Sequence, residues 1–295
     1  MNLTAAQMHA AVGLACSTAS GIKTFAAGMG GGMMKRMHAG RPAEAGVRMA
    51  QLAARDFTAP PAAIDGRFGM LEAFGGATAQ PDFLSANLGK QWAIERVFVK
   101  VYPCCSWIQA TVQQLVALRG EAPLAARDVA KIVVGTNSYA RRVNGAPTPP
   151  DTMGAQYSIP YCAALAVTAD PGDPTMYGEG QINDADRRDL ARRVELVIDE
   201  RMEAVYPQHY GARVELHLAN GECRKSFVLD PHGMPGDPYT EAERLAKFTR
   251  LAAGMLSSAA ITQVIAAVRD CARAPSVREL TRLLRPASQT ASAAA

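Results

Sequence analysis

The sequence predicts an α+β protein from two observations. Stretches with helical spacing occupy both ends of the chain, and short β-type runs separated by helices lie between them. The first helical stretch covers residues 1 to about 85, the mixed part begins near Val97, and helical spacing returns after Pro238. No internal repeat is visible, so we expect a helical part, an α/β part and a final set of helices.

The first helical stretch begins with a capping box. Thr4-Ala-Ala-Gln7 opens an alanine-rich helix that we expect to run to Ser20, with Gly21 as its end. This helix is apolar or small on nearly every face, which predicts burial on all sides. Pro42 suits the first turn of a second helix, and residues 64–74 suit a third.

The middle of the chain alternates between β-type and helical patterns. Short β-branched runs predict strands, and apolar residues at helical spacing predict helices between them. The predicted strands are residues 97–99, 132–134 and 194–198, and the predicted helices are residues 108–116 and 158–169.

A hairpin is the clearest local signal. Residues 213–218 alternate in polarity, Asn-Gly follows, and the chain runs back to residue 229. A two-residue Asn-Gly loop favours a type I′ turn, which would pair Leu218 with Cys223. His217 would then face Arg224 on the opposite face, as an exposed strand residue with no catalytic role.

The last part of the chain is helical. Thr240-Glu-Ala-Glu243 is a second capping box, and it opens a helix over residues 242–256. Residues 261–272 and 277–284 predict two further helices. The small and polar residues 286–295 predict a frayed tail.

Composition excludes several classes of protein. The chain has 295 residues, of which 48% are hydrophobic and 20% charged, as in globular proteins. The net charge is +4 and no Lys/Arg run resembles a nucleic-acid stripe, so we expect no nucleic-acid partner. No apolar stretch reaches membrane-spanning length and the start lacks a secretory pattern, so we expect a cytoplasmic protein without membrane contact.

The cysteines offer no metal pattern. The six cysteines form no CxxC motif and no spacing with histidine that is typical of metal ligands. We therefore expect reduced, buried thiols and no metal site, and an aconitase-type hydratase finds no cluster ligands here.

Three stretches combine reactive side chains with special backbone. They are residues 35–41 (KRMHAGR), residues 100–105 (KVYPCC) and residues 156–161 (QYSIPY). Each also has a structural explanation: a solvated loop, a strand end, and a core tyrosine with a satisfied hydroxyl. Only a fold that brings the stretches together makes them a site.

In this order, the three stretches resemble the 2-methylcitrate dehydratase (MmgE/PrpD) family. That family includes 2-methylcitrate dehydratase, cis-aconitate decarboxylase and iminodisuccinate epimerase. The matching motifs are ASG at residues 19–21, KRMHAGRPAEAGVRMAQLAARDF at residues 35–57, KVYPCC at residues 100–105 and YSIPY at residues 157–161. The resemblance extends over residues 3 to 285.

The resemblance implies an architecture with two domains. Residues 1–90 would form part of an all-α domain, residues 91–238 a smaller α/β lid domain, residues 239–285 C-terminal helices that pack on the helical domain, and residues 286–295 the frayed tail. It also implies a cleft that binds a small di- or tricarboxylate without a metal or an organic cofactor, and a homodimer.

The resemblance also implies site residues. The catalytic residues would be Lys35, His38, Lys100 and Tyr161, and the substrate-binding residues would be Arg36, Arg41 and Gln109. The two lysines would hold carboxylates and stabilise negative charge, an arginine would supply a bidentate clamp, and His38 or Tyr161 would deliver a proton. The glycines at residues 28–32 would let the backbone approach the ligand.

Two departures from the family pattern bear on activity. Gln109 stands where the family often has a histidine, and glutamine cannot carry a proton at neutral pH. The family also has an upstream helical segment with an acidic motif and two histidines, and this chain begins after it. We therefore expect a fragment of a cofactor-independent carbon–oxygen lyase or isomerase, working as a homodimer or with a complementing N-terminal half.

The alternative is a catalytically inactive truncated or split-subunit protein that keeps carboxylate binding or a scaffold role. The sequence leaves the substrate open, together with the choice among dehydration, decarboxylation and epimerisation, since these reactions share a carbanion-like start.

Overall fold

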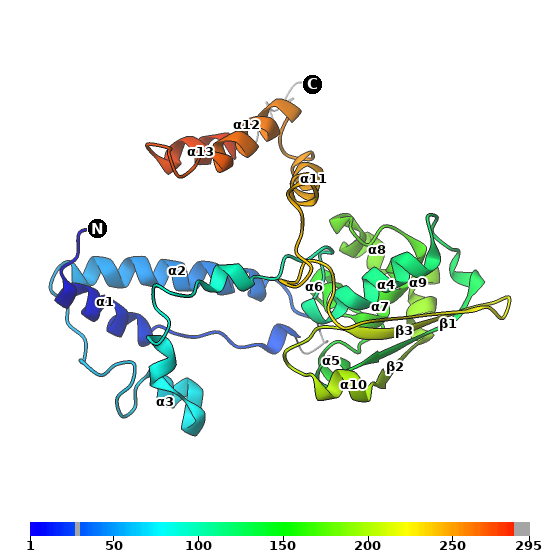
Figure 1. The fold of residues 1–295 in the computed structure, drawn as a ribbon, viewed down its shortest axis with the longest axis horizontal. Helices are drawn as coiled ribbons and strands as arrows, with labels where there is room; N and C mark the ends of the chain where they lie inside the picture. Colours follow the sequence, from blue (N-terminus) through cyan, green and yellow to red (C-terminus); the bar gives the residue numbers. More distant parts are fainter. Residues whose placement is uncertain (27–29, 286–295) are drawn as a thin grey trace, which may run out of the picture. The chain divides into compact units, whose positions relative to one another are not determined.

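The computed structural model describes residues 1–26 and 30–285 of the chain. Helices and a four-stranded sheet occur in it, so the predicted α+β class is confirmed (Figure 1). The chain divides into two compact units, Met1–Pro235 and Gly236–Ala295. The predicted frayed tail at residues 286–295 and the expectation for Gly28 lie outside the described residues.

The sheet is mixed. Its strands are β1 (Val129–Thr136), β2 (Val194–Ile198), β3 (Ala212–Leu218) and β4 (Cys223–Val228). They lie in the order β2-β1-β3-β4, with β2 parallel to β1 and the other neighbours antiparallel (Figure 1). The predicted strands at residues 132–134 and 194–198 are confirmed.

The strand predicted at residues 97–99 is wrong. This stretch has no strand assignment, and the Val99 amide donates to the carbonyl of Gly233 at 3.0 Å. This stretch therefore pairs with a loop residue and does not join the sheet, because β-propensity describes how side chains fit a pleated surface and does not by itself select a strand partner.

Helices cover one face of the sheet. The helices of this α/β part are α4 (Gln109–Arg119), α5 (Ser138–Val143), α6 (Thr152–Gln156), α7 (Ile159–Thr168), α8 (Glu179–Ile182), α9 (Ala185–Arg192) and α10 (Glu200–Ala204). Helix α7 packs against both α4 and α9, and residues 159–167 of α7 are all buried. Ser158 caps α7 by accepting the Tyr161 amide at 3.0 Å. The predicted buried helix is confirmed.

The sheet alternates between a buried and a solvent-facing side. Val134 pairs with Val214 and Ile132 pairs with Leu216, and all four side chains are fully buried. On the other face, His217 lies opposite Lys131 of β1 and is partly exposed. This is the period of two expected of a sheet with one covered face.

The predicted hairpin exists, but its register differs by one residue. The Leu218 carbonyl accepts from the Gly221 amide at 3.1 Å and the Leu218 amide donates to Glu222 at 2.8 Å, so the loop has three residues. Gly221 has a φ of 91°, in the left-handed region. A three-residue loop with glycine at that position is the next most common hairpin connection. It places Cys223 opposite His217, where we predicted Arg224.

The N-terminal segment is helical but sparsely buried. Its helices are α1 (Ala5–Cys16), α2 (Met34–Ala53) and α3 (Met70–Gly75). The Thr4 capping box is confirmed, but α1 ends before Ser20 and buries only Ala11 and Gly13 among the described residues, so the expected burial on all sides is wrong. Helix α2 begins before Pro42, which lies inside it. Proline there removes one backbone hydrogen bond, at a cost of about 3 kcal/mol.

The second unit contains α11 (Glu241–Ala252), α12 (Ser258–Arg269) and α13 (Val277–Leu283). Both halves of the predicted capping box at Thr240 are present. The packing of residues 239–285 on the helical domain stays a prediction, as do the predicted boundaries. Across the part of the chain that the structure covers, no helix is both long and apolar enough to cross a membrane.

Candidate functional site

One face of α2 carries two of the predicted site residues. Lys35 and His38 stand three positions apart, so they lie on the same side of the helix, and both are half-buried. Arg36 and Met37 lie between them and are exposed. The helix therefore turns one ammonium and one imidazole inwards.

Phe25 is the apolar support for this face. It lies in a short 3-10 helix, Thr24–Ala26, and is buried. Its ring meets the His38 ring edge to face at 5.2 Å and the Tyr157 ring at 5.9 Å. An aromatic residue from the stretch before α2 thus joins α2 to the YSIPY segment.

Tyr157 lies under Lys35. The residue follows α6 directly, and the Lys35 Nζ is 4.8 Å from the centre of its ring. Burial raises the pKa of Tyr157 to about 12, the Cys105 thiol adds to this, and Lys23 opposes it. The phenol is therefore protonated at neutral pH and can donate a hydrogen bond to an anion.

Lys100 is brought close to the same place. Burial lowers the pKa of Lys100 below its ordinary value; the neighbouring Cys105 opposes this, and the like charge of Lys35 lowers it further. Burial raises the pKa of the Cys105 thiol, against the influence of both lysines. Two lysines from segments far apart in the sequence therefore share one environment, which raises the electrostatic cost of each charge.

A third lysine joins them. The Lys23 ammonium donates to the Tyr139 hydroxyl at 2.5 Å and lies 5.1 Å from the centre of that ring. The bond to Tyr139 is the main cause of the raised pKa of Lys23, and Tyr157 and Cys105 contribute. We call Lys23, Lys35 and Lys100 the ammonium cluster.

Aromatic packing holds Tyr139 in place. Its ring stacks on Tyr206 at 5.7 Å and contacts Trp107 at 6.2 Å. Trp107 in turn stacks on Tyr210 at 4.3 Å. The partner of Lys23 is therefore anchored in the α/β part, so Lys23 bridges the N-terminal segment and the α/β part.

The glycine loop has a structural role at Gly31 and Gly32. Both amides donate to the Asp151 carboxylate, at 3.0 and 2.9 Å, and the same carboxylate caps α6 by accepting the Gly154 amide at 2.7 Å. A Cβ on Gly31 would lie 2.3 Å from the Met153 side chain. At Gly31 the close approach that we expected toward a ligand is made instead to α6.

Tyr161 and Gln109 have core contacts. Tyr161 is fully buried and its hydroxyl donates to the Met176 carbonyl at 2.5 Å. Gln109 is also buried, accepts the Tyr102 amide at 3.0 Å and donates to the Tyr102 carbonyl at 2.9 Å. The contacts of Tyr161 stabilise the core, and those of Gln109 stabilise the YPCC turn. The roles of proton delivery for Tyr161 and substrate binding for Gln109 stay predictions.

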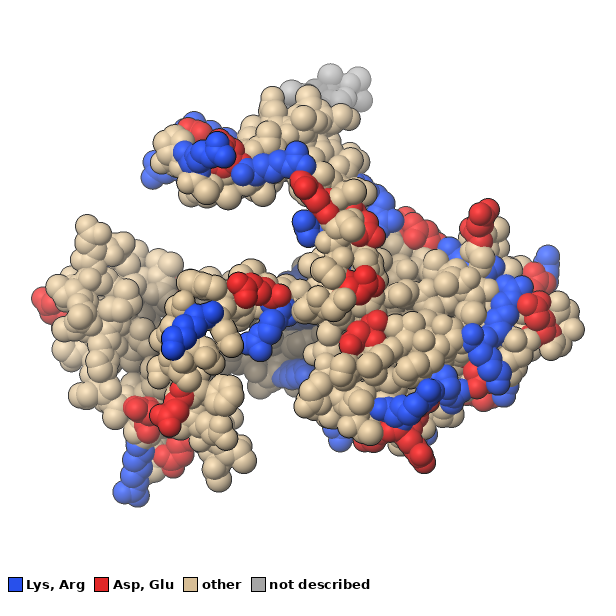
Figure 2. Space-filling view, in the orientation of Figure 1, with Lys and Arg blue, Asp and Glu red and all other residues tan. Residues whose placement is uncertain are grey.

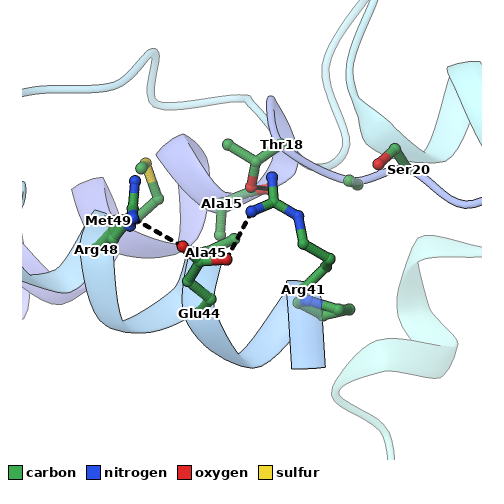
Figure 3. Close-up of a pocket in the computed structure, with 10 residues that line it drawn as sticks. Ala15, Thr18, Ser20, Arg41, Glu44, Ala45, Arg48 and Met49 are labelled. Carbon is green, nitrogen blue, oxygen red and sulfur yellow. Dashed lines mark hydrogen bonds and ion pairs between the residues drawn. The ribbon is translucent and has the colours of Figure 1, made fainter. Parts of the chain in front are cut away.

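The two predicted arginines, Arg36 and Arg41, are both exposed. Arg41 pairs with Glu44 at 2.5 Å, and Arg48 pairs with the same carboxylate at 2.7 Å. Arg41, Glu44 and Arg48 line a pocket of about 390 Å³ between α2 and the end of α1. Thr18 lines the same pocket (Figure 3). In this pocket the Arg41 charge is already matched by a carboxylate, which leaves it less available to an anionic ligand.

Sequence reasoning missed Lys23, Tyr139 and Tyr157. Lys23 follows the ASG motif by two positions, and Tyr157 opens the same YSIPY motif as Tyr161, so proximity to the motifs was an available signal. Nothing in the sequence marks Tyr139, because its position depends on packing between α5 and the turn that carries Trp107.

The site suits an anion. Positive charge is gathered beside thiol and phenol groups, and Lys35 and Lys100 are half-buried, so their attraction for an anion is stronger than in water. The same charges repel a metal cation. A ligand with two or three carboxylates could engage more than one ammonium group at once.

Known proteins resemble this chain over most of its length. Residues 1–81 match the MmgE/PrpD N-terminal domain and residues 102–271 match the MmgE/PrpD C-terminal domain. A cis-aconitate decarboxylase-like protein, oryM, of Aspergillus oryzae is 23% identical over 305 residues, covering 96% of this chain and 61% of the relative. The cis-aconitate decarboxylase of Aspergillus terreus is 23% identical over 301 residues, covering 96% and 60%.

The chain thus spans about three fifths of the length of these curated relatives. The matches to both domain types together cover more than half of its residues, in the order of the motifs described above. The chain belongs to the MmgE/PrpD family.

Proposed function

We propose that the ammonium cluster binds a small di- or tricarboxylate, as the anion site of a lyase or isomerase that works without a cofactor. The observation that carries the proposal is the shared environment of Lys35 and Lys100, in which each lysine acts on the thiol of Cys105. Lys23 extends the positive charge on the side of Tyr139. The names of the relatives support a substrate of the cis-aconitate type.

The chemistry of such a substrate explains why lysines are useful. Removal of a proton from the carbon next to a carboxylate moves an electron pair onto the carboxylate oxygens. Ammonium groups placed at those oxygens stabilise the extra charge, and more strongly in a place shielded from water. Lys100 is the best suited to this, since its burial is the largest cause of its lowered pKa.

The second half of the reaction requires a proton donor. In a dehydration, the electron pair returns to form the double bond, and the hydroxyl group leaves with a proton as water. In a decarboxylation, the carbanion left by carbon dioxide takes up the proton. His38 is the donor that we propose in either case, because it lies on the same face of α2 as Lys35.

We propose that the upstream helical part carried by the family supplies the base and covers the apolar surface of the N-terminal segment. Large apolar side chains are exposed there, among them Met33, Phe57, Phe68, Phe74, Phe83 and Trp92. Patches of this kind mark interaction surfaces. A second copy of the chain is the other candidate for covering this surface, and a test must distinguish it from the upstream helical part.

A binding protein without turnover is the second candidate. Besides His38, the neighbours of the ammonium cluster are Phe25, Tyr139, Tyr157 and Cys105, none of which is a carboxylate, and burial raises the pKa of both Tyr157 and Cys105. This observation favours carboxylate binding by the chain alone, with catalysis requiring a further part.

A thermal shift experiment tests the binding. The purified chain is heated with citrate, cis-aconitate, 2-methylcitrate, succinate and acetate, and a specific ligand at a hundred times its Kd should add about 2.7 kcal/mol of stability. A Lys35→Met/Lys100→Met variant should lose the shift, and Lys90→Met, at an exposed lysine, should keep it. Equal shifts for all ligands in both variants would contradict the proposal.

Turnover assays separate the two candidates. The chain alone and the chain mixed with a polypeptide for the upstream helical part are supplied with 2-methylcitrate, cis-aconitate and iminodisuccinate. Turnover only in the mixture supports the complemented enzyme, and turnover by a dimer of the chain alone supports the second copy. Binding without turnover in either case supports the binding protein.

A further inference from the structure

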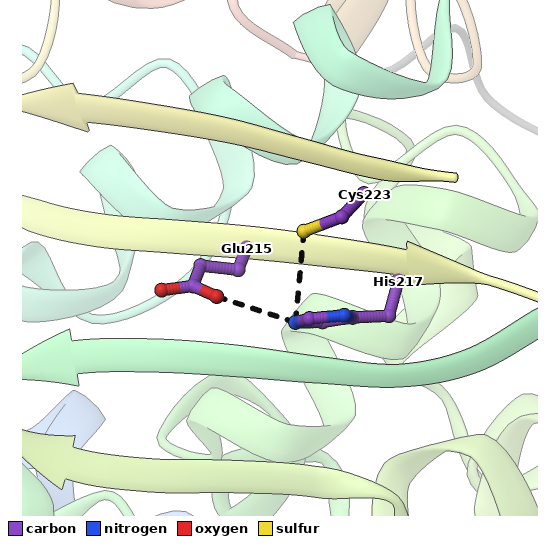
Figure 4. A group of neighbouring side chains, drawn as sticks. All are labelled: Glu215, His217 and Cys223. Carbon is purple, nitrogen blue, oxygen red and sulfur yellow. Dashed lines mark hydrogen bonds and ion pairs between the residues drawn. The ribbon is translucent and has the colours of Figure 1, made fainter. Parts of the chain in front are cut away.

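The exposed face of the β3–β4 hairpin carries three different ligating groups. Glu215 and His217 are two positions apart on β3, so their side chains lie on the same face. Cys223, the first residue of β4, is the direct partner of His217 across the ladder. In Figure 4 the carboxylate and the thiol both point towards the same side of the imidazole ring.

The distances between these groups are those of a small coordination shell. The Glu215 Oε2 is 3.3 Å from the His217 Nε2, and the Cys223 Sγ is 3.8 Å from the same nitrogen (Figure 4). All the ligating atoms lie within 4.8 Å of one another. In a tetrahedral zinc site, with bonds of about 2.0–2.3 Å, neighbouring ligand atoms are about 3.3–3.8 Å apart.

The hairpin register creates this arrangement. With a two-residue loop, Cys223 would pair with Leu218 and point to the buried face. The three-residue loop shifts β4 by one position, and a shift of one residue moves every side chain to the other face. The same shift makes Cys223 an exposed residue.

Neighbouring side chains orient the carboxylate. The Arg213 guanidinium bonds the Glu215 Oε1, and Arg213 is itself held by Asp199 at 3.0 Å. This leaves the Oε2 turned towards His217. Outer partners that fix a ligand in this way are a regular feature of metal sites.

Two lysines approach the same face of the hairpin, and one of them would compete with a cation for the Glu215 carboxylate. The Lys225 Nζ lies 3.2 Å from the Glu215 Oε2 and would have to move aside, which its largely exposed side chain permits. Lys131, opposite His217 on β1, is engaged with Glu195 at 3.1 Å. This competition lowers the affinity of the site for a cation but does not prevent binding.

From this geometry we infer that Glu215, His217 and Cys223 bind Zn²⁺, with water in the fourth position. The donor set of one sulfur, one nitrogen and one oxygen suits a borderline-soft divalent cation. On binding, the Cys223 thiol gives its proton to solvent, the neutral His217 offers the Nε2 lone pair, and Lys225 leaves the carboxylate. The site shares no residue with the ammonium cluster.

Cobalt is the probe for the test, because Co²⁺ occupies zinc sites and absorbs light when bound to a thiolate. The full chain, reduced and stripped of metal, is titrated with Co²⁺ while the near-ultraviolet thiolate-to-cobalt band is recorded. We expect the band to appear, and an equimolar amount of Zn²⁺ to abolish it.

Matched variants assign the ligands. Cys223→Ser should lose the band, Cys271→Ser, at the other exposed cysteine, should keep it, and His217→Gln should weaken Co²⁺ binding at least tenfold. Lys225→Met should tighten binding several-fold, since it removes the competitor and no ligand. A band that persists in Cys223→Ser, an absent band in the unaltered chain, or weaker binding in Lys225→Met would each overturn the inference. Carboxylate thermal shifts should be the same in Cys223→Ser as in the unaltered chain, so the two sites can fail independently.

Discussion

The α/β part and the N-terminal segment use apolar side chains in opposite ways. All members of the main buried cluster lie between Cys104 and Leu216, from the YPCC turn through α4, α7 and the sheet. In residues 1–97, by contrast, large apolar side chains such as Phe68, Phe83 and Trp92 are mostly exposed. Over α1 and α2, the face in view in Figure 2 is largely free of charged residues.

This difference separates a part that holds its own core from a part that needs a neighbour. Burial of a large apolar side chain contributes about 1.5–3 kcal/mol, so a segment that leaves them exposed forgoes that stabilisation. The ammonium cluster lies where the two parts meet, since Lys23 and Lys35 come from the N-terminal segment and Lys100 from the start of the α/β part. The rigidity of the site therefore depends on the weaker part.

Core truncation should give the largest effect. Leu216→Ala removes a fully buried side chain between β3 and the covering helices and should cost about 2–5 kcal/mol of unfolding free energy. Leu88→Ala, at a side chain that is 75% exposed, should stay within about 0.5 kcal/mol. Urea unfolding followed by tryptophan fluorescence measures both, and equal losses would remove the contrast between the parts.

Hydrogen exchange should show the same contrast. Amides in α7, a helix buried along its length, should exchange at least ~100-fold more slowly than those in α2, which buries only Ala53 among its residues. Mass spectrometry of peptides from the two helices gives the ratio. If a covering polypeptide is added, protection should rise in α2 and stay unchanged in α7. Similar protection in the isolated chain would mean that the N-terminal segment is as stable as the α/β part.

Lys100→Met should make the folded chain more stable and should weaken carboxylate binding. Because burial and Lys35 lower the pKa of Lys100, its charged form is disfavoured in the folded state, and the variant should have a higher Tm at neutral pH. Carboxylate binding should fall about tenfold, or about 1.4 kcal/mol. In the unaltered chain, binding should weaken as pH rises through the lowered pKa, before ordinary lysines deprotonate. Lys90→Met is the control, and a Tm that falls in Lys100→Met would reverse the sign of this prediction.

Acid should weaken the hydrogen bonds that the Gly31 and Gly32 amides donate to Asp151. This is the smallest of the predicted effects. Burial opposes ionisation of Asp151, but the amides of Gly154, Gly32 and Gly31 outweigh it and hold its pKa below the ordinary value. Its contribution is complete above pH ~4 and is lost as pH falls through the lowered pKa. Asp151→Ala, which removes the cap of α6 and the acceptor of the glycine amides, should cost about 0.5–2 kcal/mol at neutral pH, as for other helix caps. The variant should also lose less stability than the unaltered chain as pH falls below the ordinary aspartate pKa of about 4.

Local chemistry was readable from the sequence. The capping boxes at Thr4 and Thr240 and the alternation of β3 depend on residues a few positions apart, and the structure has them all. The family could also be read from ordered motifs, because those motifs are short and continuous.

The sequence by itself therefore determined the family, the α+β class and most elements, since each follows from neighbours along the chain. Only the tertiary structure decided which tyrosine of YSIPY meets Lys35, that Lys23 joins the cluster, and that Cys223 faces His217. Each of these depends on the distance between segments, and a single residue of register or one helical turn changes the outcome. Periodicity records which face a side chain takes within its element, but packing alone determines what lies opposite that face.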